Sequence, residues 1–145
     1  MVVVDTEFLF GLRKDDPHHP ECKAILDKDS KHLLIPGFAI LEIVLVMMSQ
    51  KKDTTSIKGF LESLLEIKSQ YHMEERKIGL QEFIKGLEIL ETYPDRSFFD
   101  AMMASIALLT DQDILSNDSA FEKIPQLRRH KLKDFMQLFD SNSSP

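Results

Sequence analysis

The chain has 145 residues, of which 43% are hydrophobic and 29% are charged, and its formal net charge is −6. This length and composition predict one soluble domain with a single core. Proteins that hold nucleic acid mainly by neutralising phosphates are usually basic, so the net charge disfavours a simple nucleic-acid coat. It leaves open an enzyme whose own carboxylates bind metal ions.

The single cysteine, Cys22, excludes an internal disulfide and a cysteine-based zinc site, and it fits a reducing cytoplasm. The longest apolar run, at 38–48, contains Glu42 and is well short of the ~20 residues that span a bilayer. The N-terminus lacks a basic segment followed by an apolar one, so no signal peptide is expected. We therefore expect a cytoplasmic protein without a membrane span, with one domain at 1–140 and a disordered tail at 141–145.

Short β-branched runs alternate with segments of helical periodicity along the chain. The pattern predicts, in chain order, a strand at 1–5, helices at 6–12 and 21–28, a strand at 32–36, helices at 37–49 and 56–68, a strand at 70–76, a helix from about 80 to 94, a helix at 97–109, a strand from 114 that ends before 118, an edge strand at 128–132 and a helix at 133–139. This order implies an α/β fold with a small, mostly parallel sheet of about five strands and helices on both faces.

Two acids stand where predicted strands end. Asp5 ends the first strand, and Asp118 follows the fourth. Ligands of parallel sheets bind at the carboxyl ends of the strands, so both side chains are expected at the same edge. Each also has an ordinary explanation, because Asp5 can cap the helix that begins at Thr6, and Asp118 can occupy a turn or cap the Ser-Ala-Phe-Glu turn that follows it.

Two more acids interrupt apolar helices. Glu42 lies within Phe-Ala-Ile-Leu-Glu-Ile-Val-Leu-Val-Met-Met, where an uncompensated carboxylate costs about several kcal/mol. The alternative is a narrow exposed stripe or a pair with a lysine. Asp100 fits a capping box with Ser97, which on its own explains an acid in the first turn. Together, however, the four acids predict a carboxylate cluster around one edge of the sheet.

An oxygen-rich cluster suits Mg²⁺ or Mn²⁺ rather than zinc. His18 and His19 have no partner at metal-ligand spacing and are interpreted as surface residues. The sequence contains no phosphate-binding glycine loop, no dinucleotide fingerprint and no Gly-x-Ser-x-Gly elbow. Aspartyl-phosphate phosphatases remain an alternative, because Glu7 stands two residues after Asp5, although they use aspartate there.

Four short motifs, in this order and at this spacing, resemble those of the PIN-domain family of metal-dependent ribonucleases. They are Val-Val-Val-Asp5-Thr6-x-x-Leu9, Glu42 in the helix after the second strand, Phe99-Asp100-Ala101 followed by Ala104 and Ala107, and Ser116-Asn-Asp118-x-x-Phe121. The segment Asp-Asp-Pro-His-His-Pro-Glu-Cys-Lys-Ala-Ile-Leu also resembles the loop and helix after the first motif. The resemblance covers about 1–129. It departs from the family in the acidic Glu7 and in Ser116, where threonine is commoner.

The resemblance implies that Asp5, Glu42, Asp100 and Asp118 hold one or two Mg²⁺ or Mn²⁺ ions. It implies that Thr6 and Ser116 orient carboxylates or a bound water. The expected reaction is hydrolysis of an RNA phosphodiester bond by in-line displacement, leaving a 5′-phosphate and a 3′-hydroxyl. The layout also resembles the toxins of toxin–antitoxin pairs, which implies a small antitoxin protein and a homodimer as partners.

Basic pairs are available to hold RNA, and Arg13 with Lys14 is preferred because it follows the helix that leaves Asp5. Ordinary solvated surface is the alternative for any such pair. Two other functions remain open at this stage. One is a non-catalytic RNA-binding or scaffold module, and the other is an RNA-processing nuclease without an antitoxin.

Overall fold

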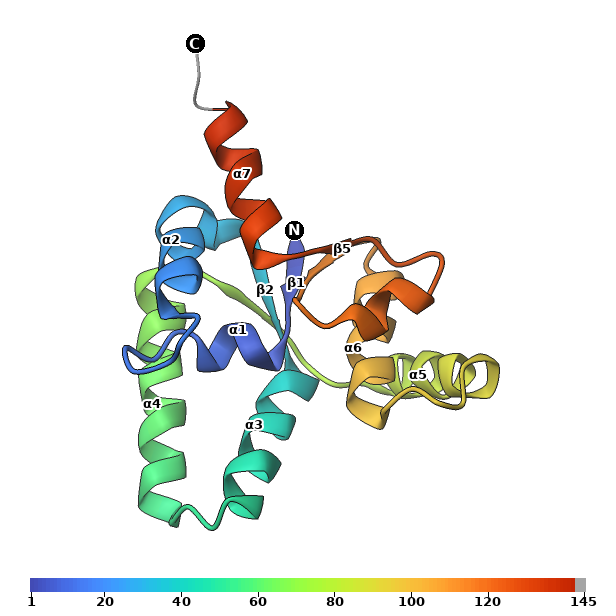
Figure 1. Ribbon diagram of the computed structural model, residues 1–145. Coiled ribbons are helices and arrows are strands. Elements are labelled where there is room, and N and C mark those ends of the chain that lie inside the picture. Colours follow the sequence, from blue (N-terminus) through green and yellow to red (C-terminus); the bar gives the residue numbers. More distant parts are fainter. Residues whose placement is uncertain (143–145) are drawn as a thin grey trace.

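The computed structural model describes the backbone of residues 1–142 and the side chains of 1–137 as a five-stranded sheet surrounded by helices (Figure 1). The strands are β1 (Val2–Val4), β2 (Leu33–Pro36), β3 (Glu74–Arg76), β4 (Asp113–Leu115) and β5 (Arg129–His130). The α-helices are α1 (Thr6–Phe10), α2 (His19–Asp29), α3 (Gly37–Ser49), α4 (Thr54–Gln70), α5 (Leu80–Thr92), α6 (Phe98–Leu109) and α7 (Leu132–Asn142), and the 3-10 helices are η1 (Ser30–His32) and η2 (Ser119–Lys123).

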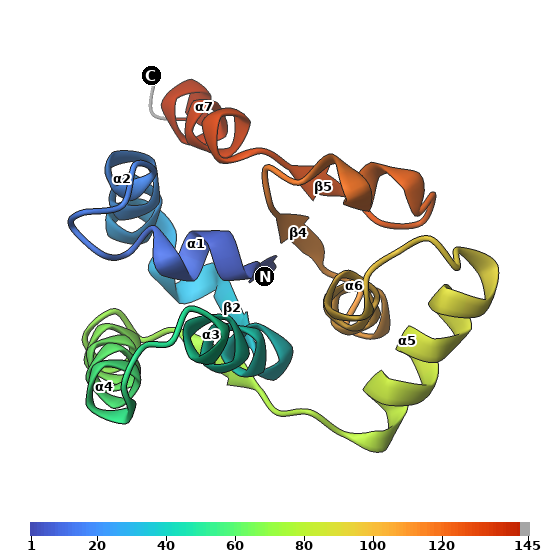
Figure 2. The ribbon, with the colours of Figure 1, turned by 60° about the horizontal axis from the view of Figure 1, so that its bottom comes forward.

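The sheet has the strand order β3-β2-β1-β4-β5, and every neighbouring pair is parallel. Val3 of the central strand pairs with Leu34 on one side and with Ile114 on the other. Figure 2 shows α1, α2 and α4 on one side of the sheet and α5 and α6 on the other, with α3 in front of one end of the sheet. The predicted α/β fold with helices on both faces is therefore confirmed.

Most predicted elements are present, with shifted ends. The helix predicted at 56–68 is α4, which is longer because Asp53 caps it, its carboxylate accepting the Ser56 amide at 2.7 Å. This longer helix shortens the strand predicted at 70–76. Since α4 continues to Gln70 and the chain then turns through His72 with φ 55°, only Glu74–Arg76 remain for β3.

The second helix begins earlier than predicted. The predicted start is Glu21, but α2 begins at His19 and contains Pro20 in its first turn. Proline is tolerated there because the first amides of a helix have no intrahelical partner. At the other end of the chain, α7 runs to Asn142. The tail predicted at 141–145 thus falls mostly outside the described residues and stays a prediction.

The core lies on both faces of the sheet, and its packing fixes the position of α6 relative to the strands. Residues Ala101 to Ala107 of this helix are all buried, because α6 lies between the sheet and α5. Gly86 of α5 permits the close approach, since a Cβ there would lie 2.4 Å from the sulfur of Met102. Asp100, in the first turn of α6, therefore has a fixed position relative to the sheet. In the described part of the chain, no helix is both long and apolar enough to cross a membrane.

Candidate active site

The carboxyl edge of the parallel sheet carries the four predicted acids. Asp5 directly follows β1, and Asp118 follows β4 after two intervening residues. Glu42 lies in α3, which begins where β2 ends. Asp100 reaches the same edge from the opposite direction, because the end of α6 leads to the amino end of β4 and its start therefore lies at the carboxyl end.

A hydrogen-bonded network joins the first and the last of these acids. Asp5 is only 6% exposed, and its Oδ1 accepts the amide of Phe8 at 2.9 Å. Its Oδ2 accepts the hydroxyl of Ser116, and the same hydroxyl oxygen accepts the amide of Asp118 at 3.0 Å. Ser116, itself buried, thus connects the end of β1 to the loop after β4.

Helix capping explains part of this geometry but not all of it. Asp5 caps α1, and Asp118 caps η2 by accepting the amide of Ala120 at 2.9 Å. Ser97 caps α6 by accepting the amide of Asp100 at 3.1 Å. The capping readings of the sequence were therefore correct for these positions. Capping occupies one oxygen of Asp5 and one of Asp118, whereas Asp100 contributes only its amide, and the second oxygen of Asp5 accepts the hydroxyl of Ser116.

Glu42 and Asp100 are half-buried rather than exposed. Burial raises the pKa of Glu42, a nearby Thr6 hydroxyl opposes that rise, and the charges of Asp100 and Asp118 add to it. Burial likewise raises the pKa of Asp100, with Ser97 and Arg96 opposing the rise and Asp118 adding to it. Because Glu42 is half-buried, the alternative that it lies on an exposed stripe is not supported.

Asp5 has the largest shift of the set. Burial raises its pKa to about 6, against opposing hydrogen bonds from Ser116 and Phe8, and the charges of Glu7 and Asp118 raise it further. The charge of Asp118 thus raises the pKa of each of the other three acids, and the charge of Asp100 also raises that of Glu42. Four segments that are distant in sequence converge on one acidic edge.

Comparison with known proteins identifies the family. The family model described as PIN domain matches residues 2–127. The chain belongs to the PIN-domain family. The comparison with curated proteins finds no match.

Solved structures of toxin–antitoxin systems share this PIN fold. One chain of FitAcB from Neisseria gonorrhoeae aligns with a TM-score of 0.69 at 14% identity, covering 92% of this chain and 99% of that one. VapC20 of Mycobacterium tuberculosis, described as a toxin that cleaves the sarcin-ricin loop, aligns at 0.67 and 15%, covering 86% and 95%. VapBC2 of Rickettsia felis, bound to a promoter DNA fragment, aligns at 0.66 and 16%, covering 90% and 98%. At these identities the likeness establishes the fold.

The donor set of this PIN domain fits a hard divalent cation. All four acids offer oxygen ligands, which Mg²⁺ and Mn²⁺ prefer. The hydroxyl of Thr6 is buried and forms no hydrogen bond of ordinary geometry within the described residues, although it lies near Glu42. Such an orphaned oxygen beside a carboxylate is suited to a bound water or ion. As they stand in residues 1–137, however, no three acid, histidine or cysteine side chains are already arranged to hold a metal ion.

Two buried arginines brace the last motif, and sequence reasoning did not single them out for this role. Arg96, with a side chain 8% exposed, donates to the carbonyl of Ala120 at 3.3 Å and pairs with Asp95 at 2.6 Å. Arg129, 5% exposed, donates to the carbonyl of Ser116 at 3.2 Å. Together they hold both ends of the loop that carries Asp118. The sequence signals were weak: Arg96 directly precedes Ser97, and Arg129 lies within the predicted edge strand at 128–132.

The remaining predicted residues lie around this centre. Glu7, which departs from the family pattern, forms an ion pair with Nε2 of His18 at 3.0 Å and raises the pKa of Asp5. His18 is partly exposed, as expected for a surface residue, and its contact is with the partly exposed Glu7. Arg13 and Lys14 lie beyond the end of α1 and line a groove that faces α4.

Proposed function

We propose that this PIN domain is a metal-dependent endoribonuclease that hydrolyses RNA phosphodiester bonds. The observation that carries the proposal is the convergence of Asp5, Glu42, Asp100 and Asp118 at one edge of the sheet, where burial and mutual repulsion raise the pKa of the first three. Gathering acids in this way is costly unless a cation offsets their charge. The family membership adds nuclease activity as the expected chemistry.

The four carboxylates would hold one or two Mg²⁺ or Mn²⁺ ions, with Asp5 as the most rigid ligand because both of its oxygens are already hydrogen-bonded. When bound, the ions supply an activated water and charge stabilisation for in-line displacement at phosphorus. Ser116 keeps the Asp5 carboxylate oriented, and the buried hydroxyl of Thr6 is placed to orient Glu42 or a water. The expected products carry a 5′-phosphate and a 3′-hydroxyl.

RNA is the proposed substrate, and Arg13 and Lys14 are its proposed contacts outside the carboxylates. Both side chains line the groove that begins where α1 ends. The chain has a net charge of −6, so RNA needs local cations to approach the acidic edge.

A small antitoxin protein is a proposed partner, and its support is the set of toxin–antitoxin structures that share the fold. An apolar hollow of about 590 Å³ between α3 and α4 offers a surface on which an apolar segment of such a partner could pack. Its apolar lining consists of Val44, Met48, Ile57, Leu61 and Leu65. Since the only cysteine is reduced and buried, the proposed location is the cytoplasm.

A homodimer is also proposed, through α5. This helix turns an apolar stripe to solvent, with Leu80 82% exposed and Ile84 and Leu87 more than half exposed. Exposed apolar stripes of this kind commonly mark an interface. Sedimentation at micromolar concentration tests it, and Leu80→Glu with Ile84→Lys should convert a dimer into a monomer.

The decisive experiment is cleavage of a labelled RNA by the purified full chain with and without Mg²⁺. Asp100→Asn and Glu42→Gln should each lower the rate at least a hundredfold and also abolish the rise in melting temperature that Mg²⁺ causes in the unaltered protein. Asp111→Asn is the matched control, because Asp111 is exposed at the opposite edge and has a φ of 50° that asparagine tolerates. RNA binding without Mg²⁺-dependent cleavage would instead support a non-catalytic RNA-binding or scaffold module.

If cleavage is confirmed, expression in cells separates the two remaining possibilities. Growth arrest that Asp100→Asn removes, and that a co-expressed small protein neutralises, identifies a toxin. Cleavage without growth arrest identifies an RNA-processing nuclease without an antitoxin.

A further inference from the structure

We infer that the groove between α1, α3 and α4 binds the phosphate backbone of single-stranded RNA beside the cleaved bond, with Arg13 and Lys52 as its two anchors. The inference rests on the proposed function and adds to it a second binding site. It also reassigns the partner of Arg13, since sequence reasoning paired this residue with Lys14.

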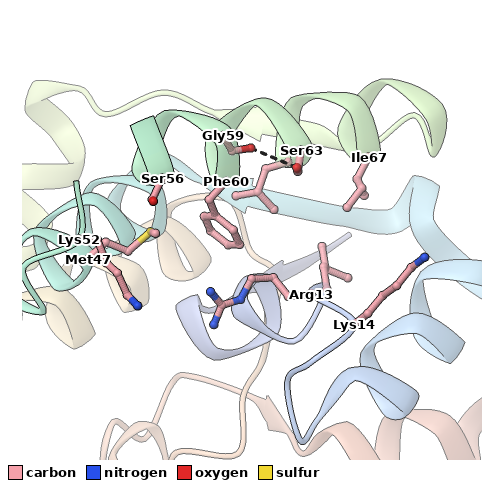
Figure 3. Close-up of a pocket in the computed structure, with 11 residues that line it drawn as sticks. Arg13, Lys14, Met47, Lys52, Ser56, Gly59, Phe60, Ser63 and Ile67 are labelled. Atoms are coloured by element: carbon pink, nitrogen blue, oxygen red, sulfur yellow. Dashed lines mark hydrogen bonds between the residues drawn. The ribbon is translucent and has the colours of Figure 1, made fainter. Parts of the chain in front are cut away.

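The groove has a volume of about 540 Å³ and is shown in Figure 3. Its lining comes from the end of α1, the end of α3 and the middle of α4, and consists of Leu12, Arg13, Lys14, Met47, Lys52, Ser56, Gly59, Phe60, Ser63, Leu64 and Ile67. None of these lining residues is acidic. In a chain with net charge −6, this groove is therefore a local concentration of positive charge.

Arg13 is held in place by aromatic rings rather than by an acid. Its guanidinium carbon lies 5.4 Å from the ring centroid of Phe10 and 5.3 Å from that of Phe60, and the two rings stack at 5.5 Å. Its only ion-pair contact within the described residues is Asp15, at 3.9 Å. Cation–π contacts orient a guanidinium without cancelling its charge, so Arg13 is fixed in place and still able to bind an anion.

Lys52 supplies the second cation at the same end of the groove. Figure 3 shows its ammonium group pointing toward the guanidinium of Arg13, whereas the ammonium of Lys14 points away from both. Two cations that converge from different parts of the chain can each contact one of the two non-bridging oxygens of a phosphodiester. Lys14 is left at the opposite end of the groove, where it can only contact a longer ligand.

Three of the six residues that α4 contributes to the groove wall are small. Ser56, Gly59 and Ser63 occupy one side of the helix, and a Cβ built on Gly59 would meet no atom within 4 Å. A chain as bulky as a sugar–phosphate backbone can therefore lie against α4. The Ser63 hydroxyl, bonded to the Gly59 carbonyl at 3.1 Å, adds a polar group to this wall.

The accessible surface of the groove favours RNA over an apolar protein segment. Leu12, Met47, Phe60 and Leu64 form its floor but are each no more than 8% exposed, so polar and charged groups make up a larger share of the surface of this groove than of the neighbouring hollow. The neighbouring hollow between α3 and α4 has the opposite character, since Met48 and Leu65 there are 59% and 63% exposed. An apolar partner fits that hollow, and a phosphate chain fits the groove.

The groove and the acidic edge share the helices α1 and α3. The helix α1 begins beside Asp5 and ends at the groove, and α3 carries Glu42 and, five residues later, Met47 of the groove floor. Since Arg13 lies three residues beyond the end of α1 and Lys52 lies three residues beyond the end of α3, a single helix separates each cation from one of the acids. An RNA strand cleaved at the carboxylates can thus reach Arg13 and Lys52 within a few nucleotides.

The test is the affinity of a fluorescein-labelled, 12-nucleotide single-stranded RNA for the full chain, measured by anisotropy in EDTA between 50 and 200 mM KCl. The double variant Arg13→Gln with Lys52→Gln should bind about tenfold more weakly at low salt, and its log–log salt slope should fall by about 1.4, because each phosphate contact on a single strand contributes about 0.7. Lys31→Gln with Lys133→Gln removes the same charge elsewhere and should bind like the unaltered protein. Equal slopes for the two double variants would overturn the inference.

A second pair of variants separates groove blocking from misfolding. Gly59→Glu places an acid in the groove, where the Cβ has open space, and should weaken RNA binding. Ser69→Glu adds the same charge to α4 outside the groove lining and should leave RNA binding unchanged. Binding of a labelled 12-residue polyglutamate peptide that depends on Arg13 and Lys52, with RNA binding unaffected, would overturn the inference in favour of a protein partner. Mg²⁺-dependent cleavage, together with RNA binding that the groove variants do not change, would contradict only this inference. RNA binding that depends on the groove, without cleavage, would contradict only the proposed function.

Discussion

The hydroxyl of Ser116 donates to Oδ2 of Asp5, across 111 positions of sequence, and accepts the amide of Asp118. One buried side chain therefore fixes the distance between the first and the last acid of the site. Ser116→Ala leaves a buried carboxylate oxygen and an amide without this partner, which should lower the free energy of unfolding by about 1–3 kcal/mol and weaken Mg²⁺ binding. Ser116→Thr keeps the hydroxyl and should preserve Mg²⁺ affinity in calorimetry. Equal Mg²⁺ affinity for the alanine variant would show that this bond does not organise the site.

The raised pKa of Asp5 predicts a pH dependence of stability. In the folded chain this pKa is about 6, against 3.8 for an unperturbed aspartate. The folded state therefore binds more protons than the unfolded state between pH 4 and 6, and stability falls as the pH rises through this window. Above pH 6 the raised pKa of Asp5 lowers the free energy of unfolding by on the order of 3 kcal/mol.

Asp5→Asn should remove most of this dependence. In metal-free buffer its free energy of unfolding, from urea titrations at pH 4.5 and 7.5, should vary less with pH and exceed that of the unaltered chain at pH 7.5. Glu42 and Asp100 are shifted in the same direction and keep a smaller residual slope. An unchanged pH profile of stability in the asparagine variant would mean that the pKa of Asp5 is not raised in the folded chain.

Arg96 should matter to activity although it is not one of the acids. It holds the carbonyl of Ala120 at the end of the Asp118 loop, and its charge lowers the pKa of Asp100. Losing a residue that orients a ligand typically costs about 10–100-fold, so Arg96→Gln should lower kcat/KM by that factor and move the acid limb of the pH–rate profile upward. Arg96→Lys should not restore it, since lysine lacks the fork that bonds both Asp95 and Ala120.

Arg128→Gln is the control for this prediction. Arg128 pairs with Asp113 at 2.7 Å at the amino end of β4, and its side chain is 67% exposed. The rate of this variant should match that of the unaltered chain. A similar loss in both variants would point to a general charge effect rather than to the Asp118 loop.

Two glycine-to-alanine substitutions in helix interiors should act with opposite sign. Gly59 of α4 has open space at the Cβ position, so Gly59→Ala should raise the free energy of unfolding by about 0.5–1 kcal/mol through helix propensity. Gly86 of α5 faces the sulfur of the buried Met102, so Gly86→Ala should lower it by about 1–2 kcal/mol through overpacking. Chemical denaturation of both variants measures the two signs, and stabilisation by Gly86→Ala would mean that α5 is not packed tightly on α6.

The sequence predicted the acids better than it predicted their surroundings. Asp5 and Asp118 follow buried strands, and the rule that parallel strands end at one edge places them together without any side-chain detail. Glu42 was recognisable because an acid inside an apolar helix needs a partner. The structure adds that the charge of Asp118 raises the pKa of Asp5 and of Glu42.

The parts that sequence reasoning missed depend on long side chains and loop paths. Arg96 and Arg129 reach carbonyls that are 24 and 13 positions away, and no periodicity predicts where an arginine side chain ends. Lys52 joins Arg13 only because α3 and α4 form a hairpin beside the end of α1. Proximity between elements decided these contacts, and proximity becomes visible only in the fold.

The most direct measurement is a crystal structure of the full chain soaked in Mn²⁺, with the ion located by its anomalous signal. The account predicts one or two peaks at the carboxyl edge of the sheet, bound by oxygens of Asp5, Asp100 and Asp118 with Glu42 in contact directly or through a water, and no such peak in Asp100→Asn. Manganese bound only elsewhere, with Glu42 and Asp100 turned away from Asp5, would contradict the account.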